Sequence, residues 1–258
     1  MPDVPAELKV MSFNIRYGTA SDGENSWPFR RDAVLDFLGT CGCDVIGLQE
    51  VLAAQLQEIR QALPHFHFVG VGRDDGYSAG EYAAILYDSR RIRLGSSETF
   101  WFSETPEVIA STSWGNELTR ICTRGTFFLG ELRFDVYNIH IDHESAISRL
   151  KSVELLVHRA GHTDVPVIVT GDFNEGESGP AVDLIIRSGF LDTYRAMNPD
   201  GPEQASYHGW TNAVDGDKID YVFVTSGWSI VDATIIRDTP YGRFLSDHYP
   251  VKATLEFS

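Results

Sequence analysis

Acidic, amide and imidazole side chains stand at the ends of short apolar segments along this chain. They are Asn14, Glu50, His140, Asp142, His143, Asp172, Asn174, Asp220, Asp247 and His248. Carboxylate and amide oxygens suit hard cations such as Mg²⁺ and Mn²⁺, and an imidazole can stabilise charge on a phosphoryl group. Polar groups beside buried strands are costly unless they pair or bind an ion. The pattern therefore predicts one polar site for metal and phosphoester chemistry.

Each of these features also has an ordinary explanation when it is taken alone. Glu50 can be an acidic residue at a helix N-terminus. Residues 171–174, Gly-Asp-Phe-Asn, can form an Asx-type turn, and residues 247–248, Asp-His, can be a surface pair. His140 can be a hydrogen-bonded histidine in or near the core. Their joint occurrence along the chain favours the functional explanation.

The apolar segments predict an α/β protein in which strands outnumber helices. Because side chains alternate along a strand, His140 and Asp142 can share one face of their strand, and Asp172 and Asn174 can share one face of theirs. Because many adjacent strands have short connections, we expect two mostly antiparallel or mixed β-sheets flanked by helices. Without repeats or a linker, residues 1–258 should form one domain. The expected strands are 8–15, 44–48, 66–71, 82–87, 121–129, 132–141, 165–170, 219–224, 228–236 and 249–257, and the expected helices are 29–38, 51–63, 145–160 and 180–188.

Composition narrows the classes of partner. The chain has 21 Lys and Arg residues against 37 Asp and Glu residues, so its formal net charge is −16. Such a field repels polyanions on average, which disfavours long duplex nucleic acid. The three cysteines form no regular disulfide framework. Neither a signal peptide nor a membrane span is visible, so we expect a soluble, cytoplasmic monomer.

Six segments, taken together, resemble the endonuclease/exonuclease/phosphatase superfamily, which includes deoxyribonuclease I, abasic-site endonucleases and inositol-polyphosphate 5-phosphatases. The resemblance implies a four-layer αββα sandwich and a hydrolase of phosphoesters. The segments span nearly the whole chain in the order of the family. They are MSFNIR (11–16), LQEV (48–51), NIHIDH (138–143), GDFN (171–174), KIDYVF (218–223) and SDHYPV (246–251).

Within that superfamily, the chain is most similar to bacterial single-domain members of unassigned substrate. The segments that carry this likeness are NSWPFR (25–30), WGNELTR (114–120) and SYHGW (206–210). One departure concerns abasic-site endonucleases, which usually carry an acidic residue where this chain has Arg16. Obvious basic insertions that could grip DNA are also missing. Both observations disfavour a role in DNA repair.

The resemblance implies a role for each polar residue of the site. Glu50 would be the principal ligand of Mg²⁺ or Mn²⁺, with Asn14 and Asp247 completing or orienting its shell. Asp172 would orient or deprotonate the attacking water, and Asn174 would hold that water or a phosphate oxygen.

The histidines would act on the phosphoryl group. His248 would stabilise its charge, with Asp220 fixing the ring and favouring the imidazolium. His140 would bind the phosphate from the other side or act as general acid. Arg120 can clamp a phosphate through its fork of donors, or it can form an ordinary surface ion pair.

Several aromatic and basic residues in polar loops could line a specificity pocket, although such residues also anchor loops against a core. They are Trp27, Arg30, Trp114, His208 and Trp210. We therefore predict a metal-dependent hydrolase of a small or accessible phosphoester, including nucleotide-type substrates. A nuclease acting on DNA or RNA is the alternative, and an inactive binding protein is a third possibility.

Overall fold

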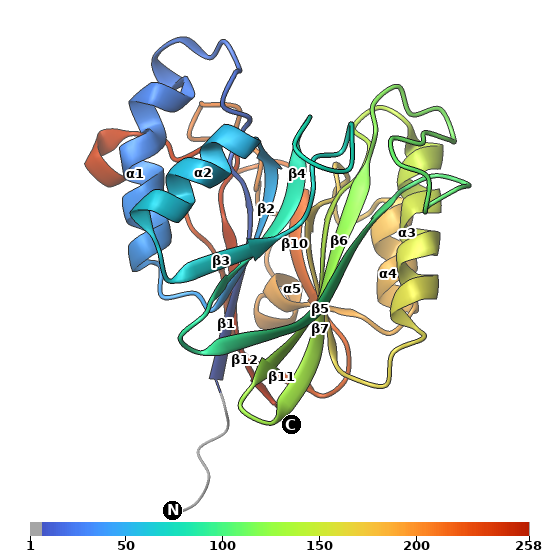
Figure 1. Ribbon diagram of the computed structural model, residues 1–258. Coiled ribbons are helices and arrows are strands. Elements are labelled where there is room, and N and C mark those ends of the chain that lie inside the picture. The colour runs from blue at the N-terminus through green and yellow to red at the C-terminus, as the bar shows by residue number, and fades with distance from the viewer. Residues whose placement is uncertain (1–6, 258) are drawn as a thin grey trace, which may run out of the picture.

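Two six-stranded sheets pack face to face in the computed structural model, which describes residues 7–257 (Figure 1). The first sheet has the order β11-β12-β1-β2-β4-β3 and the second has the order β5-β6-β7-β8-β10-β9. The strands of the first sheet are β1 (Glu7–Asn14), β2 (Val45–Val51), β3 (Phe66–Val69), β4 (Tyr82–Asp88), β11 (Trp228–Ile235) and β12 (Val251–Phe257). Those of the second are β5 (Ile92–Trp101), β6 (Ile121–Leu129), β7 (Leu132–His140), β8 (Val167–Asp172), β9 (Leu191–Asp192) and β10 (Asp220–Val224).

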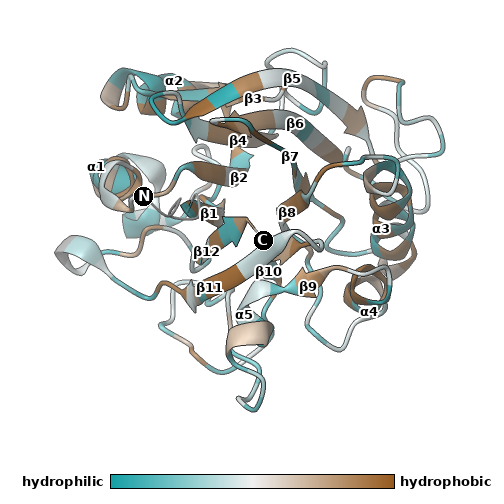
Figure 2. Ribbon diagram, turned by 90° about the horizontal axis from the view of Figure 1, so that it is seen from below, coloured by the Kyte–Doolittle hydropathy of each residue, from teal (hydrophilic) through white to brown (hydrophobic). Residues whose placement is uncertain are grey.

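Helices cover the outer faces of both sheets. Seen from below, helices lie outside each of the two sheets (Figure 2). These helices are α1 (Trp27–Thr40) and α2 (Ala53–Ala62) on the first sheet, and α3 (Ala146–Ala160) and α4 (Pro180–Arg187) on the second. The short helix α5 (Thr193–Met197) packs near β10 and β11. The short 3₁₀ helices are η1 (Gly23–Asn25) and η2 (Pro240–Gly242). The expected four-layer αββα sandwich is confirmed.

The central strands are apolar on both faces because each face meets a different layer. On β1, Leu8 and Val10 point into the core between the sheets, whereas Met11 and Phe13 pack toward α1 and α2. Strands buried on both sides read as continuous apolar runs, which is why such segments are easily recognised in the sequence.

The same alternation carries the polar strand ends into the space between the sheets. Asn14 has the parity of Val10 and therefore lies on the inner face of β1. Asp172 and Asp220 are paired across β8 and β10, and His140 is paired with Asp172 across β7 and β8. These residues consequently meet at one edge of the sandwich, the upper edge in Figure 1, away from the end of β12.

A buried amide links the two sheets just below that edge. Asn138 on β7 donates to the backbone oxygens of Leu48 and Ala84, each at 2.9 Å, and accepts from Gln49 Nε2 at 2.6 Å. A Cβ on Gly47 would lie 2.5 Å from Asn138 Oδ1, so the sheets approach too closely here for any larger residue. The register of the sheets is thus fixed directly beneath the polar edge.

One strand differs from the sequence-based expectation. Residues 92–101 form the edge strand β5, whose middle is polar and exposed and so lacks an apolar pattern. Each sheet contains one parallel pair, β1 with β2 and β7 with β8, so both sheets are mixed, in agreement with the expected mostly antiparallel or mixed sheets. No helix within residues 7–257 is long and apolar enough to cross a membrane. The start of the chain, where we expect no signal peptide, lies outside the described residues.

The Asn138 contacts predict a large effect on stability. We expect Asn138→Leu to lower the free energy of unfolding by about 3 kcal/mol, because two buried carbonyl groups lose their donor. Urea denaturation followed by circular dichroism measures this. Gln61→Leu on the exposed surface of α2 is the control and should change stability by less than about 0.5 kcal/mol. A comparably small loss in Asn138→Leu would contradict the structural role.

Candidate active site

A cavity of about 440 Å³ opens at the edge where the polar strand ends meet. Its floor is buried, since Asp172 and His248 are 1% and 6% exposed. Residues near its mouth, such as Tyr207 and Leu118, are about half exposed, at 49% and 44%. The lining residues are Arg16, Tyr17, Glu50, Arg73, Glu81, Leu118, Arg120, His140, His143, Asp172, Asn174, Tyr207, Ile219, Asp247 and His248.

Glu50 reaches this cavity through an irregularity in its strand. Simple alternation would place it with Ile46 and Leu48 on the face that packs under the helices. Instead the β2–β4 register shifts between Leu48 and Val51, and Glu50 adopts a left-handed backbone with φ of 60°. Such a conformation is strained for a residue other than glycine and is typical of functional sites. The backbone thus turns this carboxylate toward the cavity.

Asn14 joins the two sides of the cavity floor. Its Nδ2 donates to Glu50 Oε1 at 3.0 Å and to Asp172 Oδ2 at 2.9 Å. Glu50 also accepts the backbone N–H of Tyr17 at 3.1 Å. This amide brings together the carboxylates of Glu50 and Asp172, whose oxygens are the hard donors that divalent cations of the Mg²⁺ type prefer. The residues present therefore fit a divalent metal ion.

Excess negative charge at the floor is a second sign of this fit. Burial and then the nearby Asp220 carboxylate raise the pKa of Asp172 to about 7, against the opposing effects of His248 and Asn14. A cation at the floor would relieve this cost and favour the ionised form. Ligand atoms of Asp172, Asp220 and His248 lie within 4.8 Å of one another, in a fully buried group.

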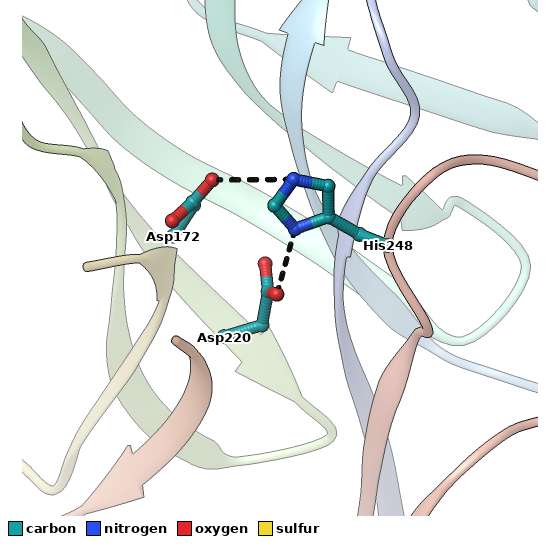
Figure 3. A group of neighbouring side chains, drawn as sticks. All are labelled: Asp172, Asp220 and His248. Atoms are coloured by element: carbon teal, nitrogen blue, oxygen red, sulfur yellow. Dashed lines mark hydrogen bonds and ion pairs between the residues drawn. The ribbon is translucent and has the colours of Figure 1, made fainter. Parts of the chain in front are cut away.

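His248 lies between these two carboxylates (Figure 3). Its Nδ1 is 2.8 Å from Asp220 Oδ2, and its Nε2 is 3.9 Å from Asp172 Oδ2. Burial lowers the pKa of His248, but Asp220 outweighs burial, with help from Asp172 and Asp247, and raises the pKa to about 10. The ring is therefore an imidazolium at neutral pH, with Nδ1 donating to Asp220.

Ser206 holds the Asp220 carboxylate in place. Its hydroxyl donates to Asp220 Oδ2 at 2.8 Å and accepts the backbone N–H groups of Ile219 and Asp220 at 2.8 and 2.9 Å. All four groups are buried or nearly so. This contact fixes the partner of His248 and was not predicted from the sequence.

His140 faces Asp172 from the opposite side, with His140 Nε2 3.8 Å from Asp172 Oδ2. Its Nδ1 is 3.8 Å from Glu81 Oε2, and Glu81 accepts from Arg73 Nη1 at 2.8 Å. Burial, reinforced by Arg120 and Arg73, holds the pKa of His140 well below its usual value. A neutral ring fits the predicted phosphate contact better than the predicted general acid.

Sequence reasoning missed Glu81 and Arg73, although one signal was present. Glu81 directly precedes the apolar strand Tyr82–Asp88, which is the strand-end position that identified the other site residues. Arg73 stands in a polar loop and carries no comparable signal. Both line the cavity.

Asn174 and Arg120, the residues expected to contact the water or the phosphate, lie in the cavity lining. The backbone N–H of Asn174 donates to Asp172 Oδ1 at 2.9 Å, so the ordinary Asx-turn explanation also holds. Arg120 is 3% exposed; its Nε is 3.4 Å from Asp142 Oδ2 and its Nη2 is 2.7 Å from His143 Nδ1. Arg120 is thus a buried cation rather than part of an exposed surface pair.

Asp247 lines the cavity beside Arg16. Its Oδ2 is 3.7 Å from Arg16 Nε, and its backbone oxygen accepts the N–H groups of His208 and Gly209. A role in orienting the metal site therefore fits this position better than a role as an isolated ligand.

Arg30 is a correction to the predicted specificity pocket, because it does not line the cavity. It is 1% exposed and donates to the backbone oxygens of four residues. These acceptors are Ile15, Arg16, Asn25 and Leu245. The guanidinium therefore ties the loops around the site together instead of facing a substrate.

The aromatic residues of the predicted pocket also lie outside the cavity lining. Trp27 donates to Glu58 at 2.6 Å, and the Trp114 backbone oxygen accepts from Ser145. His208 stacks on Tyr249 with ring centroids 4.1 Å apart, and Trp210 lies edge-on to His208. His208 and Trp210 thus anchor the loop behind Asp247 and His248, whereas Trp27 contacts α2 and Trp114 contacts the start of α3. Their predicted substrate contacts have no support from this geometry.

Comparison with known proteins agrees with this arrangement. A sequence model described as the Endonuclease/Exonuclease/phosphatase family matches residues 11–248. The chain belongs to this family. A family protein from Bacteroides vulgatus has 32% sequence identity and a TM-score of 0.91, with 98% of this chain and 100% of that chain covered. The predicted family membership is confirmed.

Two further solved structures are similar to this chain. The mannosyl-6-phosphatase of Bacteroides thetaiotaomicron is 29% identical, with a TM-score of 0.88 over 97% of this chain and 100% of that one. A humanized TDP2 of D. rerio is only 17% identical, with a TM-score of 0.79 over 97% and 99% of the two chains. The latter likeness shows a shared fold alone.

The His248–Asp220 contact predicts a measurable pH response. In Asp220→Asn the carboxylate that raises the pKa of His248 is lost, so this pKa should fall well below about 10. The imidazolium would then deprotonate at a lower pH, and the alkaline limb of the activity profile would move to lower pH. NMR titration of the metal-free protein follows the ring directly. Asp215→Asn, at an exposed position, should leave it unchanged; an unaltered titration in Asp220→Asn would refute the coupling.

Proposed function

We propose that this chain is a divalent-metal-dependent hydrolase that transfers the phosphoryl group of a small phosphoester to water. The observation that carries the proposal is the arrangement of His248 opposite Asp172, next to the Asn14–Glu50 pair. It combines a carboxylate for water, an imidazolium for the phosphoryl oxygens and oxygen donors for a cation. Family membership supports phosphoester chemistry in general.

The metal would be Mg²⁺ or Mn²⁺, held chiefly by Glu50 with Asn14. When bound, it supplies screening of the phosphoryl charge and stabilisation of the leaving oxygen. The side chains of the protein perform the other catalytic roles, and they hold the attacking water and the phosphoester in line.

Asp172 orients the attacking water and takes its proton. Its Oδ2 accepts from Asn14 and its Oδ1 from the Asn174 backbone, so the carboxylate is held in one orientation. In the metal-free state its pKa is about 7, which lies near the working pH of a general base. A cation nearby would lower that pKa and keep the base ionised at neutral pH.

His248 donates from Nε2 to a phosphoryl oxygen and stabilises the charge that develops in the transition state. Its Nδ1 is occupied by Asp220, which keeps the ring protonated and fixes its orientation. His140 donates to the phosphoryl group from the other side as a neutral ring. Arg120, buried in the same lining, is the candidate for a further phosphate contact.

A small substrate accords with the size of the cavity and with the net charge of −16. The similarity to a mannosyl-6-phosphatase makes phosphorylated sugars the first class to test. A nuclease remains the second candidate, because a local cationic lining with Arg16, Arg73 and Arg120 could bind a nucleic-acid backbone despite the overall charge.

Removal of the metal or of single side chains should abolish activity. We expect EDTA, Glu50→Gln and His248→Ala each to lower kcat by at least roughly 100-fold. Hydrolysis of p-nitrophenyl phosphate and bis-p-nitrophenyl phosphate in Mg²⁺ or Mn²⁺ provides the assay. Glu131→Gln and His67→Ala, at exposed positions outside the cavity, are matched controls with unchanged rates. Full activity in His248→Ala would rule out the proposed mechanism.

Substrate preference can be measured with the same preparation. We expect kcat/KM for hexose 6-phosphates to exceed kcat/KM for the nicking of plasmid DNA, because the acidic surface repels a long polyanion. A metabolite panel with His248→Ala as the inactive control separates true turnover from contamination. If plasmid nicking is faster than hydrolysis of the hexose 6-phosphates, and if its rate rises at low salt, the nuclease is favoured instead.

A further inference from the structure

Arg16 is the basic residue that most closely approaches the carboxylates assigned to the metal site. Its Nη1 lies 3.9 Å from Glu50 Oε2, and its Nε lies 3.7 Å from Asp247 Oδ2. The guanidinium also forms a two-point contact with Asp22, at 3.1 and 3.2 Å. One fixed cation therefore stands between three carboxylates at the side of the cavity.

The backbone around Arg16 holds this side chain in position. Its φ of 59° is left-handed, which directs the chain away from the strand direction of β1. The N–H of Arg16 donates to Asn14 Oδ1 at 3.0 Å, and its carbonyl accepts from Arg30 and Gln55 at 2.9 and 3.1 Å. Arg30 and Gln55 are each 1% exposed. A buried framework thus aims the guanidinium at the cavity, which it lines.

Two consequences follow for cation binding. A positive charge within 4 Å of the Glu50 and Asp247 carboxylates repels any ion that approaches that side. It also satisfies Asp247, whose oxygen would otherwise be free to bind a second ion. Glu50 Oε1 lies away from the Arg16 contact and accepts from Asn14 Nδ2 at 3.0 Å, so this is the oxygen that one ion would take in exchange for the amide donor.

We propose that Arg16 is a built-in cation that limits this chain to one divalent metal ion. The proposal rests on the metal site of the proposed function. In a two-metal site, a second ion would bring a positive charge next to the phosphoryl group. Here the guanidinium supplies that charge. Unlike an ion, it cannot dissociate, and its charge persists at every physiological pH.

Binding of Mn²⁺ to the metal-free protein, followed by the electron paramagnetic resonance of free Mn²⁺, tests the proposal without any substrate. Wild type should bind one ion per chain. Arg16→Met should bind a second Mn²⁺ ion, and should bind the first about tenfold more tightly, because a repelling charge close to the ligands is removed. Arg16→Lys keeps the charge and should bind one ion with nearly the wild-type affinity.

Other outcomes would overturn the proposal. Two ions bound by wild type, or only one ion bound by Arg16→Met, would show that Arg16 does not limit the number of ions and forms only an ordinary ion pair with Asp22. Thermal melting verifies the fold of each variant, and Arg16→Gln replaces Arg16→Met if the latter does not melt cooperatively. Glu50→Gln should lose binding. If Glu50→Gln binds as wild type does, the metal site of the proposed function is wrong; no binding by wild type would remove both proposals.

Discussion

The hydrogen bond from Asn14 to Asp172 is the contact on which the rest of the site depends. Asn14 ends β1 in one sheet and Asp172 ends β8 in the other, and both are buried. This 2.9 Å contact therefore joins the two layers where the cavity opens. Directly beneath it, Asn138 fixes the spacing of the same sheets. A hydrogen bond tolerates little change in distance. The distance between Asn14, proposed to hold the metal, and Asp172, proposed to orient the water, is therefore fixed.

Electrostatic balance is the second constraint on this edge of the protein. Carboxylates concentrated in a buried space raise the free energy unless cations offset them. His248 offsets Asp220, and Arg16 offsets Asp22 and part of the charge of Glu50 and Asp247. Crowding of carboxylates still raises the pKa of Asp172, and in the proposed function a divalent ion would offset this charge. A chain with a negative net charge is thus compatible with the proposed anionic substrate, because the balance of charged side chains around the cavity differs from the net charge of the whole chain.

Much of the fold was predictable because strands buried on both faces leave long apolar runs, as β1 and β8 do. The strand-end positions of Asp172, Asp220 and His140 also predicted which side chains share one edge. The edge strand β5 was not predictable, since its exposed middle is polar. The burial of Arg30 was equally hidden, because its acceptor at Leu245 is 215 residues away in sequence. Glu50 reaches the cavity only through a left-handed backbone, which strand alternation does not predict.

A crystal structure with Mn²⁺ and inorganic phosphate tests the central claim most directly. The account predicts anomalous density for manganese on Glu50, with a phosphate oxygen within hydrogen-bonding distance of His248 Nε2. Asp172 should face the phosphorus. Manganese bound away from Glu50, or phosphate that leaves His248 and Asp172 without a contact, would contradict the account.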